Sequence, residues 1–263
     1  MKPESQPAMQ AKSGPITFAC NGCGICCKGR LIPLTLQEAE EWLDRGNDVA
    51  VILEAFDHST YLDPAHYAHS VKRAAEVISG EARIQVVAVF AGNALTQCPS
   101  LGEDNRCGIY EDRPLVCRIY PMEINPFLTL RPEEKVCPPE VWESGDVLFS
   151  DRVVDPVLED QIQRSRQADR DDAGAKIAVC EQMGMNVAAW KGDALAVYLA
   201  DRVLLRQAIR LVRAGILGLQ TCPGKFVPMM PIFIPVWTWR ALKWILENRL
   251  TTSFIPLPYE PAG

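Results

Sequence analysis

The sequence predicts an α+β fold, with a small cysteine-rich core of short helices and a hairpin followed by a mostly helical C-terminal region. Three observations support this prediction. Helix-start signals and a strand-like stretch precede residue 98, cysteines cluster between residues 20 and 137, and helical periodicity dominates beyond about residue 145. We therefore divide the chain into a disordered tail at 1–15, a cysteine-cluster domain at 16–145 and a helical region at 146–263.

The composition is that of an ordinary globular protein, with 48% hydrophobic and 23% charged residues in a chain of 263. The formal net charge of −6 argues against a nucleic-acid partner, because phosphate binding favours a basic face. The most apolar run, Phe226 to Trp239, is short and broken by three prolines. We therefore expect no transmembrane segment.

The ten cysteines suggest metal or redox chemistry rather than disulfides. The first fifteen residues are polar and contain no apolar stretch typical of a secretory leader. This favours a cytoplasmic location, where thiols stay reduced. In such a compartment, clustered cysteines commonly bind a metal.

The first helix is predicted from its capping pattern. Thr35 and Glu38 form a capping box, and the helix that follows carries Ala39 and Trp42 on one face before it stops at Gly46. The apolar stretch 49–56 is interpreted as a second short helix.

The next elements are a longer helix and a hairpin. Asp63 and Pro64 are a good helix start, and the helix is expected to run to about Ser79 and end at Gly80. Residues 82–91 are rich in β-branched side chains and predict a strand. Gly92 and Asn93 then suggest a two-residue turn, with 94–97 returning as the second strand.

The C-terminal half shows mainly helical periodicity. Its candidate helices are 155–170, 172–184, 186–191, 193–214 and 236–250.

The first cysteine group is Cys20-x2-Cys23-Gly24-x-Cys26-Cys27. A hydrophobic core has little use for four thiols so densely interleaved with glycine. A loop that wraps its sulfurs around a metal needs both features, because C-x2-C spacing reaches one centre and glycine permits a tight backbone.

The second group spans residues 98–138 and adds Cys98, Cys107, Cys117 and Cys137. Pro114 can open a short helix that holds Cys117 in its first turn. We expect the helix N-terminus to favour the thiolate form of that cysteine.

The two groups together resemble the YkgJ-like cysteine-cluster family, which has the CxxCxxCC signature and is described as a zinc- or iron-chelating domain. The second part of the resemblance is Cys98-Pro99-x-Leu101 and Cys107-x-Ile109-Tyr110-x2-Arg113-Pro114-x2-Cys117-Arg118-x2-Pro121. The resemblance covers about residues 18–138 and implies metal binding by these cysteines. The flagellin lysine N-methylase is similar in its cysteine signature, which makes an enzymatic role conceivable, although no methyltransferase motif is visible here.

The predicted metal ligands are the eight cysteines of both groups, namely Cys20, Cys23, Cys26, Cys27, Cys98, Cys107, Cys117 and Cys137. Four thiolates satisfy either a zinc ion or a [4Fe–4S] cluster, so eight could serve two centres or one centre with spare thiols. Because adjacent side chains diverge, Cys26 and Cys27 are not expected to face one ion.

The cofactor is interpreted first as an iron–sulfur cluster of the [4Fe–4S] type, with zinc as the alternative. Three cysteines in a C-x2-C-x2-C run and two Cys-Pro pairs resemble ferredoxin ligands. The ferredoxin pattern would need a fourth cysteine where Arg30 stands, and widely separated ligands are normal for structural zinc. Arg113 and Arg118 are predicted to compensate the thiolate charge or to donate hydrogen bonds to sulfur.

Other candidates are set aside. Cys180 lies in a predicted helix and is interpreted as buried, and Cys222 lies in a loop. His66 and His69 share a helix face but have no nearby cysteine in sequence, so we interpret them as surface residues.

Three functions remain open. The first is a metal-binding protein with a redox, electron-transfer or maturation role. The second is a redox or modification enzyme that uses the centre, and the third is a zinc-stapled interaction module without catalysis. The sequence leaves open whether the partner is a protein or a small molecule.

Overall fold

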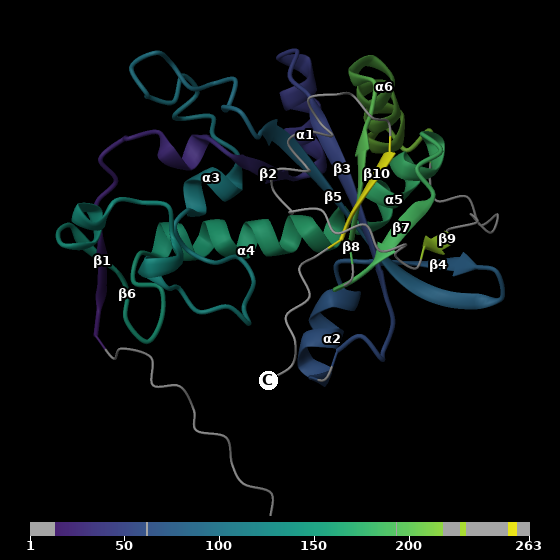
Figure 1. Ribbon diagram of the computed structural model, residues 1–263, viewed down its shortest axis with the longest axis horizontal. Helices are drawn as coiled ribbons and strands as arrows, with labels where there is room; N and C mark the ends of the chain where they lie inside the picture. Colours follow the sequence, from purple (N-terminus) through teal and green to yellow (C-terminus); the bar gives the residue numbers. More distant parts are fainter. Residues whose placement is uncertain (1–13, 62, 193, 218–226, 230–251, 257–263) are drawn as a thin grey trace, which may run out of the picture.

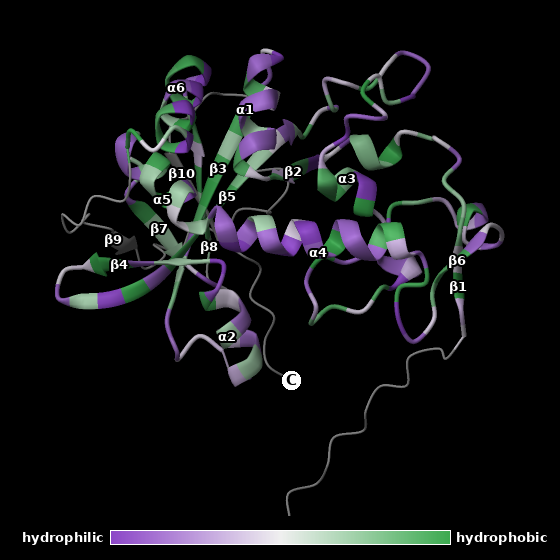
Figure 2. Ribbon diagram, turned by 180° about the vertical axis from the view of Figure 1, so that it is seen from behind, coloured by the Kyte–Doolittle hydropathy of each residue, from purple (hydrophilic) through white to green (hydrophobic). Residues whose placement is uncertain are grey.

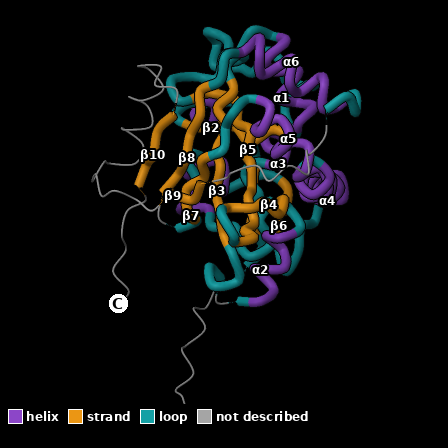
Figure 3. Tube along the Cα trace, turned by 90° about the vertical axis from the view of Figure 1, so that its right-hand side faces the viewer, coloured by secondary structure: helices purple, strands orange, loops and turns teal. Residues whose placement is uncertain are grey.

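The computed structural model describes residues 14–61, 63–192, 194–217, 227–229 and 252–256. In this part of the chain the main element is an eight-stranded sheet with the order β10-β8-β3-β5-β2 (Figures 1 and 3). β4 pairs with β5 outside this path, and β7 lies between β3 and β9. The strands of this sheet are β2 (Arg30–Leu34), β3 (Val49–Phe56), β4 (Ala75–Ser79), β5 (Ala82–Ala94), β7 (Val187–Trp190), β8 (Ala194–Leu199), β9 (Val227–Met229) and β10 (Thr252–Pro256).

Most neighbours in the sheet are antiparallel, and the parallel pairs among the described strands are β3 with β7 and β7 with β9. β3 lies at the centre and is paired along its whole length with β5. The second half of the chain completes the same sheet, because β8 from that half pairs with β3.

Helices α1 (Leu36–Asp44), α5 (Ala173–Gln182) and α6 (Arg202–Arg213) cover one face of the sheet (Figure 3). Phe90 of β5 and Ile177 of α5 are fully buried between these layers, as is Leu205 of α6. Figure 2 shows β3 as mainly hydrophobic, whereas hydrophilic and hydrophobic residues alternate along α1 and α6. The core therefore lies between the sheet and this helical layer.

A second, smaller unit of structure surrounds the cysteines. It contains β1 (Ile16–Phe18), β6 (Asp146–Phe149), α3 (Leu115–Ile119) and the 3-10 turns Ile25–Cys27, Pro132–Glu134 and Pro139–Trp142. β1 and β6 form a two-stranded antiparallel sheet. The long helix α4 (Pro156–Asp171) runs from this unit to the main sheet (Figure 1). Ile119 of α3 and Leu158 and Ile162 of α4 share a small core of their own.

The predicted α+β class is confirmed, and so is the first helix. The Thr35 hydroxyl accepts from the Glu38 N–H at 3.1 Å, and the Glu38 carboxylate accepts from the Thr35 N–H at 2.9 Å. α1 ends before Gly46, whose φ is +80°. Local capping chemistry is sufficient to set both ends of this helix.

Two helix predictions in this region are wrong. Residues 49–56 form β3 rather than a helix, because a central strand that is largely buried on both faces is apolar at nearly every position, here at all but Glu54, and lacks strand alternation. The helix that Asp63 caps, α2 (Pro64–Val71), ends well before Ser79. Residues 75–79 form β4 instead, which turns at Gly80 into β5.

The predicted turn at Gly92 and Asn93 is also wrong, since β5 continues through both residues to Ala94. The glycine is required for a close approach and not for a turn. A Cβ atom on Gly92 would lie 2.7 Å from the Trp42 ring, which packs directly onto this strand. The hairpin of the fold is the one between β4 and β5.

In the C-terminal half, the helices expected at 155–170 and 172–184 are confirmed as α4 and α5. The helix expected at 186–191 is strand β7, and residues 194–199 of the expected helix 193–214 are strand β8. Their backbone partners lie in β3, and the Tyr198 hydroxyl bonds both the N–H and the carbonyl of Val187. The helix expected at 236–250 lies outside the described residues.

Within the described residues, none of the helices has both the length and the apolar character needed to cross a membrane. Most of the predicted tail, residues 1–13, is not among the described residues.

Candidate metal centre

The first cysteine loop makes a tight approach to the second one. Gly24 has a φ of +69°, and a Cβ atom on it would lie 2.9 Å from the Asn105 carbonyl oxygen. Directly after it, the 3-10 turn over Ile25–Cys27 begins, with the Cys27 N–H bonded to the Gly24 carbonyl at 3.0 Å. Glycine is needed here for both the left-handed backbone and the space.

Two hydrogen bonds join the cysteine groups across more than seventy residues. The Cys98 N–H donates to the Cys27 carbonyl at 2.7 Å. The Lys28 ammonium donates to the Asn105 side-chain carbonyl at 3.1 Å. The two motifs are therefore neighbours in space, as a shared centre requires.

The second loop is closed by its own backbone. Leu101 and Cys107 form an isolated antiparallel bridge, and the Gly108 N–H donates to the Ser100 carbonyl at 2.7 Å. The Leu101 N–H donates to the Cys98 carbonyl at 3.0 Å. These bonds fold the chain back so that Cys107 lies beside Cys98.

The short helix α3 places Cys117 and is attached to α1. The Leu115 N–H at its start donates to the Glu38 carboxylate at 2.7 Å. Glu38 thus serves the capping box of α1 with one oxygen and the start of α3 with the other. The sheet layer and the cysteine segment share this carboxylate.

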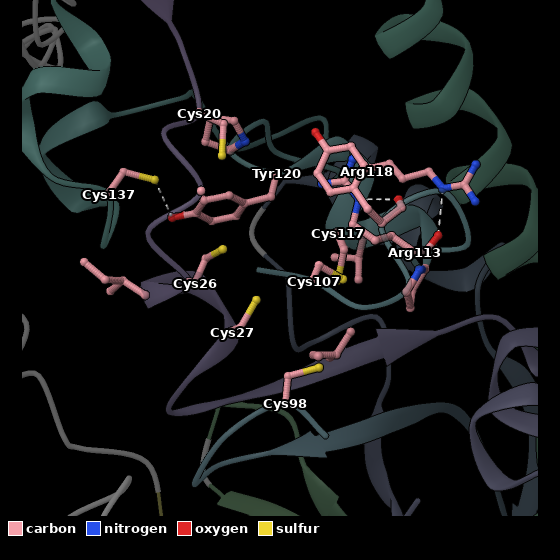
Figure 4. A pocket seen from close by; sticks show the side chains of 18 of the residues that line it. Cys20, Cys26, Cys27, Cys98, Cys107, Arg113, Cys117, Arg118, Tyr120 and Cys137 are labelled. Atoms are coloured by element: carbon pink, nitrogen blue, oxygen red, sulfur yellow. Dashed lines mark hydrogen bonds between the residues drawn. The ribbon is translucent and has the colours of Figure 1, made fainter. Parts of the chain in front are cut away.

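All eight predicted cysteines line one cavity of about 770 Å³. The nine cysteines that the structure describes are free thiols, and of these only Cys180 lies away from the cavity. Figure 4 shows thiols from both groups arranged around this space. The tertiary structure thus gathers the complete predicted set.

The thiols next to one another strongly affect each other's ionisation. A hydrogen bond from the Cys27 thiol lowers the pKa of Cys26, and the positive charges of Arg30 and Arg113 lower it further, against the effect of burial. The pKa of Cys27 is raised, first by the same hydrogen bond and then by burial. The two adjacent thiols are therefore close enough to affect each other's pKa.

The expected thiolate at Cys117 is a further correction. Burial raises the pKa of this thiol to about 12, and neighbouring thiols add to the effect. α3 has only five residues, so its dipole is small compared with the desolvation of a thiolate. A bound cation reverses this preference, because a coordinating thiol is deprotonated outright.

The two predicted arginines line the cavity but bond to main-chain oxygens. Arg118 donates to the carbonyls of Arg113 and Glu111, both at 2.7 Å. Arg113 donates to the Tyr110 carbonyl at 2.9 Å and stacks on the Tyr110 ring at 3.8 Å. Through these bonds the two arginines hold the loop between Cys107 and Cys117 in place. The positive charge of Arg113 also lowers the pKa of Cys26 and of Cys117.

Sequence reasoning missed Tyr120. Its hydroxyl accepts a hydrogen bond from the Cys137 thiol at 3.5 Å (Figure 4). Burial raises the pKa of Tyr120, and Arg30 lies over its ring at 5.1 Å. The one available signal was its position within the second motif, three residues after Cys117.

The cavity also extends to the start of α4, which sequence analysis did not connect to the site. Asp155, Leu158 and Gln161 line this end. No motif in the sequence marks these residues. They reach the site because α4 packs against α3.

The histidines do not line the cavity. His66 and His69 of α2 pack instead on Phe127, with ring centroids 4.5 and 5.5 Å away. Cys180 is fully buried in α5, as predicted, and Cys222 lies outside the described residues.

The donor set fits a thiolate metal centre in its chemistry. Reduced cysteines in this number supply what zinc or an iron–sulfur cluster requires. The buried Nε of Arg30 has no hydrogen-bond partner within the described residues, and its side chain lines the cavity. Within the described residues, no group of three or more His, Cys, Asp or Glu side chains is placed so that it could hold a metal ion without moving.

These features define a thiol-lined domain of the metal-chelating class. Residues 19–138 match the model of the CxxCxxCC family, which is described as "Putative zinc- or iron-chelating domain". The resemblance seen in the two cysteine motifs is thereby confirmed for this part of the chain. No curated protein and no solved structure matches the chain.

Proposed function

We propose that residues 19–138 bind a metal centre through their cysteine thiolates, in the first place as an iron–sulfur cluster. The observation that carries the proposal is that eight cysteines from two distant segments line one cavity as free thiols. Their reduced state fits a reducing compartment such as the cytoplasm.

Iron–sulfur is favoured over zinc by the ligand pattern, because the C-x2-C-x2-C run and the two Cys-Pro pairs resemble ferredoxin ligands. The charges of Arg30 and Arg113 act on Cys26, which suits the net negative charge of a thiolate-bound cluster. Several thiols are only partly buried, and solvent exposure is one of the factors that tune cluster potentials. On this proposal the protein carries electrons or takes part in the maturation of another metalloprotein.

The test is anaerobic purification followed by iron, sulfide and zinc analysis, with visible absorption and electron paramagnetic resonance. We expect a coloured protein with iron and sulfide in equal amounts. If the analysis finds zinc and no iron, the centre is a zinc–thiolate site with no redox activity, and the iron–sulfur part of the proposal is wrong. A folded protein that contains neither metal would contradict the whole proposal.

A second candidate is an enzyme that uses the centre, and the extent of the cavity favours it. A volume of about 770 Å³ lies within the range of small-molecule sites, and its far end at Leu158 and Gln161 carries no thiol. Native mass spectrometry of the freshly purified protein would detect a bound small molecule. We expect Gln161→Trp to expel it with the metal content unchanged, and a molecule retained by this variant would contradict the candidate.

A further inference from the structure

The eight cavity cysteines fall into two sets with different surroundings. The inner set consists of Cys27, Cys98, Cys107 and Cys117. Cys98 is 6% exposed, and Cys27 and Cys117 pack with it against the main hydrophobic core. The Cys98 N–H to Cys27 carbonyl bond and the Leu101–Cys107 bridge hold this set together through the backbone.

Electrostatic interactions connect the inner thiols with one another and also with Cys26, which raises the pKa of Cys27, Cys98 and Cys117. The charges of Cys98 and Cys117 raise the pKa of Cys27, and the charge of Cys107 raises the pKa of both Cys98 and Cys117. Each member of the inner set is thus an electrostatic neighbour of at least one other. Neither Cys20 nor Cys137 is among the principal influences on these thiols.

The outer set lies around Tyr120. Cys137 donates to the Tyr120 hydroxyl, and the thiols whose charges act on Cys137 are Cys26, Cys23 and Cys20. In Figure 4, Cys137 lies beside the Tyr120 hydroxyl and Cys20 lies above the Tyr120 ring, whereas Cys98 lies at the opposite end of the group. Cys20 is exposed, in contrast to the buried Cys98.

We propose that metal binding draws the cavity thiols together into two four-thiolate centres, an inner one on Cys27, Cys98, Cys107 and Cys117 and an outer one on Cys20, Cys23, Cys26 and Cys137. This inference rests on the proposed metal-binding function. Four thiolates are what a zinc ion or a [4Fe–4S] cluster takes, so the division leaves no cavity cysteine spare. The adjacent Cys26 and Cys27 then stand at the border, one in each centre.

The two centres differ in stability. The inner centre ties the first loop to the core of the sheet layer, and three of its thiols, those of Cys27, Cys98 and Cys117, pack against that core. The outer centre joins the exposed Cys20 to Cys137, in segments that contribute little to the core. The outer metal is therefore the more readily exchanged, and its centre is the one accessible to a redox or metal-transfer partner.

The division is tested by anaerobic titration of the reduced, metal-free full chain with Co²⁺, whose thiolate absorption reports the number of sulfur ligands. We expect saturation at two Co²⁺ per chain, each with four-thiolate absorption. The double variant Cys20→Ser/Cys137→Ser should saturate at one, with the same absorption per metal. Release to a chelator should show two phases in the wild type and only the slow phase in the variant.

Saturation of the wild-type chain at one Co²⁺ would overturn the division, as would loss of both metals in the outer variant. Cys98→Ser/Cys117→Ser should lose the slow phase, and circular dichroism reports whether it folds. If it does not fold, the outer variant alone decides. Metal analysis of the protein as purified distinguishes failure of the division from failure of the proposed function. A protein with a single metal centre would keep the metal-binding function and reject the division into two centres. A metal-free protein would reject the metal-binding function itself.

Discussion

In the sheet layer, Val51, Leu53 and Ala55 of β3 have no exposed surface, whereas most side chains between residues 101 and 136 reach solvent. The first region buries apolar side chains from strands and helices that are distant in sequence. The second has one five-residue helix and short turns, held by single hydrogen bonds. Hydrophobic burial accounts for the first region, and it is too sparse to account for the second.

The comparison shows that the sheet layer and the cysteine segment have different roles in the structure. The sheet layer provides a rigid wall, and the cysteine segment lies against it with its thiols turned into a cavity. A segment with so little core gains stability from cross-links, and a thiolate-bound metal is such a cross-link in a reducing compartment. The predictions below test whether the two regions are stabilised by these different means.

Metal removal should give the largest difference between the regions. Structural thiolate sites bind zinc with about 10–16 kcal/mol in small domains, and this energy supports folding. We expect a chelator under reducing conditions to raise amide exchange across residues 98–138 and to leave β3 and β5 protected. Hydrogen exchange with mass spectrometry measures both regions at once, and equal loss of protection in β3 would refute the distinction.

Phe90→Ala should affect the sheet layer most strongly among single substitutions. Phe90 is fully buried in β5, and removing a buried phenyl ring costs about 3–5 kcal/mol. Urea unfolding monitored by circular dichroism measures the loss. Val203→Ala is the control, because Val203 is 60% exposed and should change stability by less than about 0.5 kcal/mol.

Gly24→Ala should weaken the cysteine segment more than Gly22→Ala does. Both glycines have a left-handed φ, which costs about 1–2 kcal/mol for alanine. Only at Gly24 would the new Cβ meet a backbone oxygen, at 2.9 Å, which adds about 1–3 kcal/mol. Chelator competition should show metal binding about ten- to a hundredfold weaker in Gly24→Ala than in Gly22→Ala, and equal affinities would contradict the close approach of the two loops.

Glu38→Ala should loosen the joint between the regions, at a smaller cost of about 2 kcal/mol for two hydrogen bonds to a carboxylate. Thr35→Ala removes only the cap of α1 and should cost about 1 kcal/mol. Amide exchange at Leu115 should rise in the first variant and stay unchanged in the second. A rise in both would mean that α3 depends on the helix and not on this carboxylate.

Prediction from sequence succeeded where the cause lies within a few residues. The capping box of Thr35 and Glu38 specifies α1, and the cysteine spacing identifies all the thiols that line the cavity within the described residues. It failed at residues 49–56, 187–190 and 194–199, where apolar stretches became strands. Their partners are distant strands, and an apolar run alone does not distinguish a buried strand from a buried helix.

Side-chain type and spacing were enough to name the thiols and the chemistry they can support, because both are local properties of the chain. Their environments came from the fold. Cys117 is a partly buried thiol with a raised pKa because α3 packs against the core, and Cys137 meets Tyr120 because the chain returns across the cavity. Which thiols become neighbours depends on packing between residues far apart in sequence, and no local pattern encodes that.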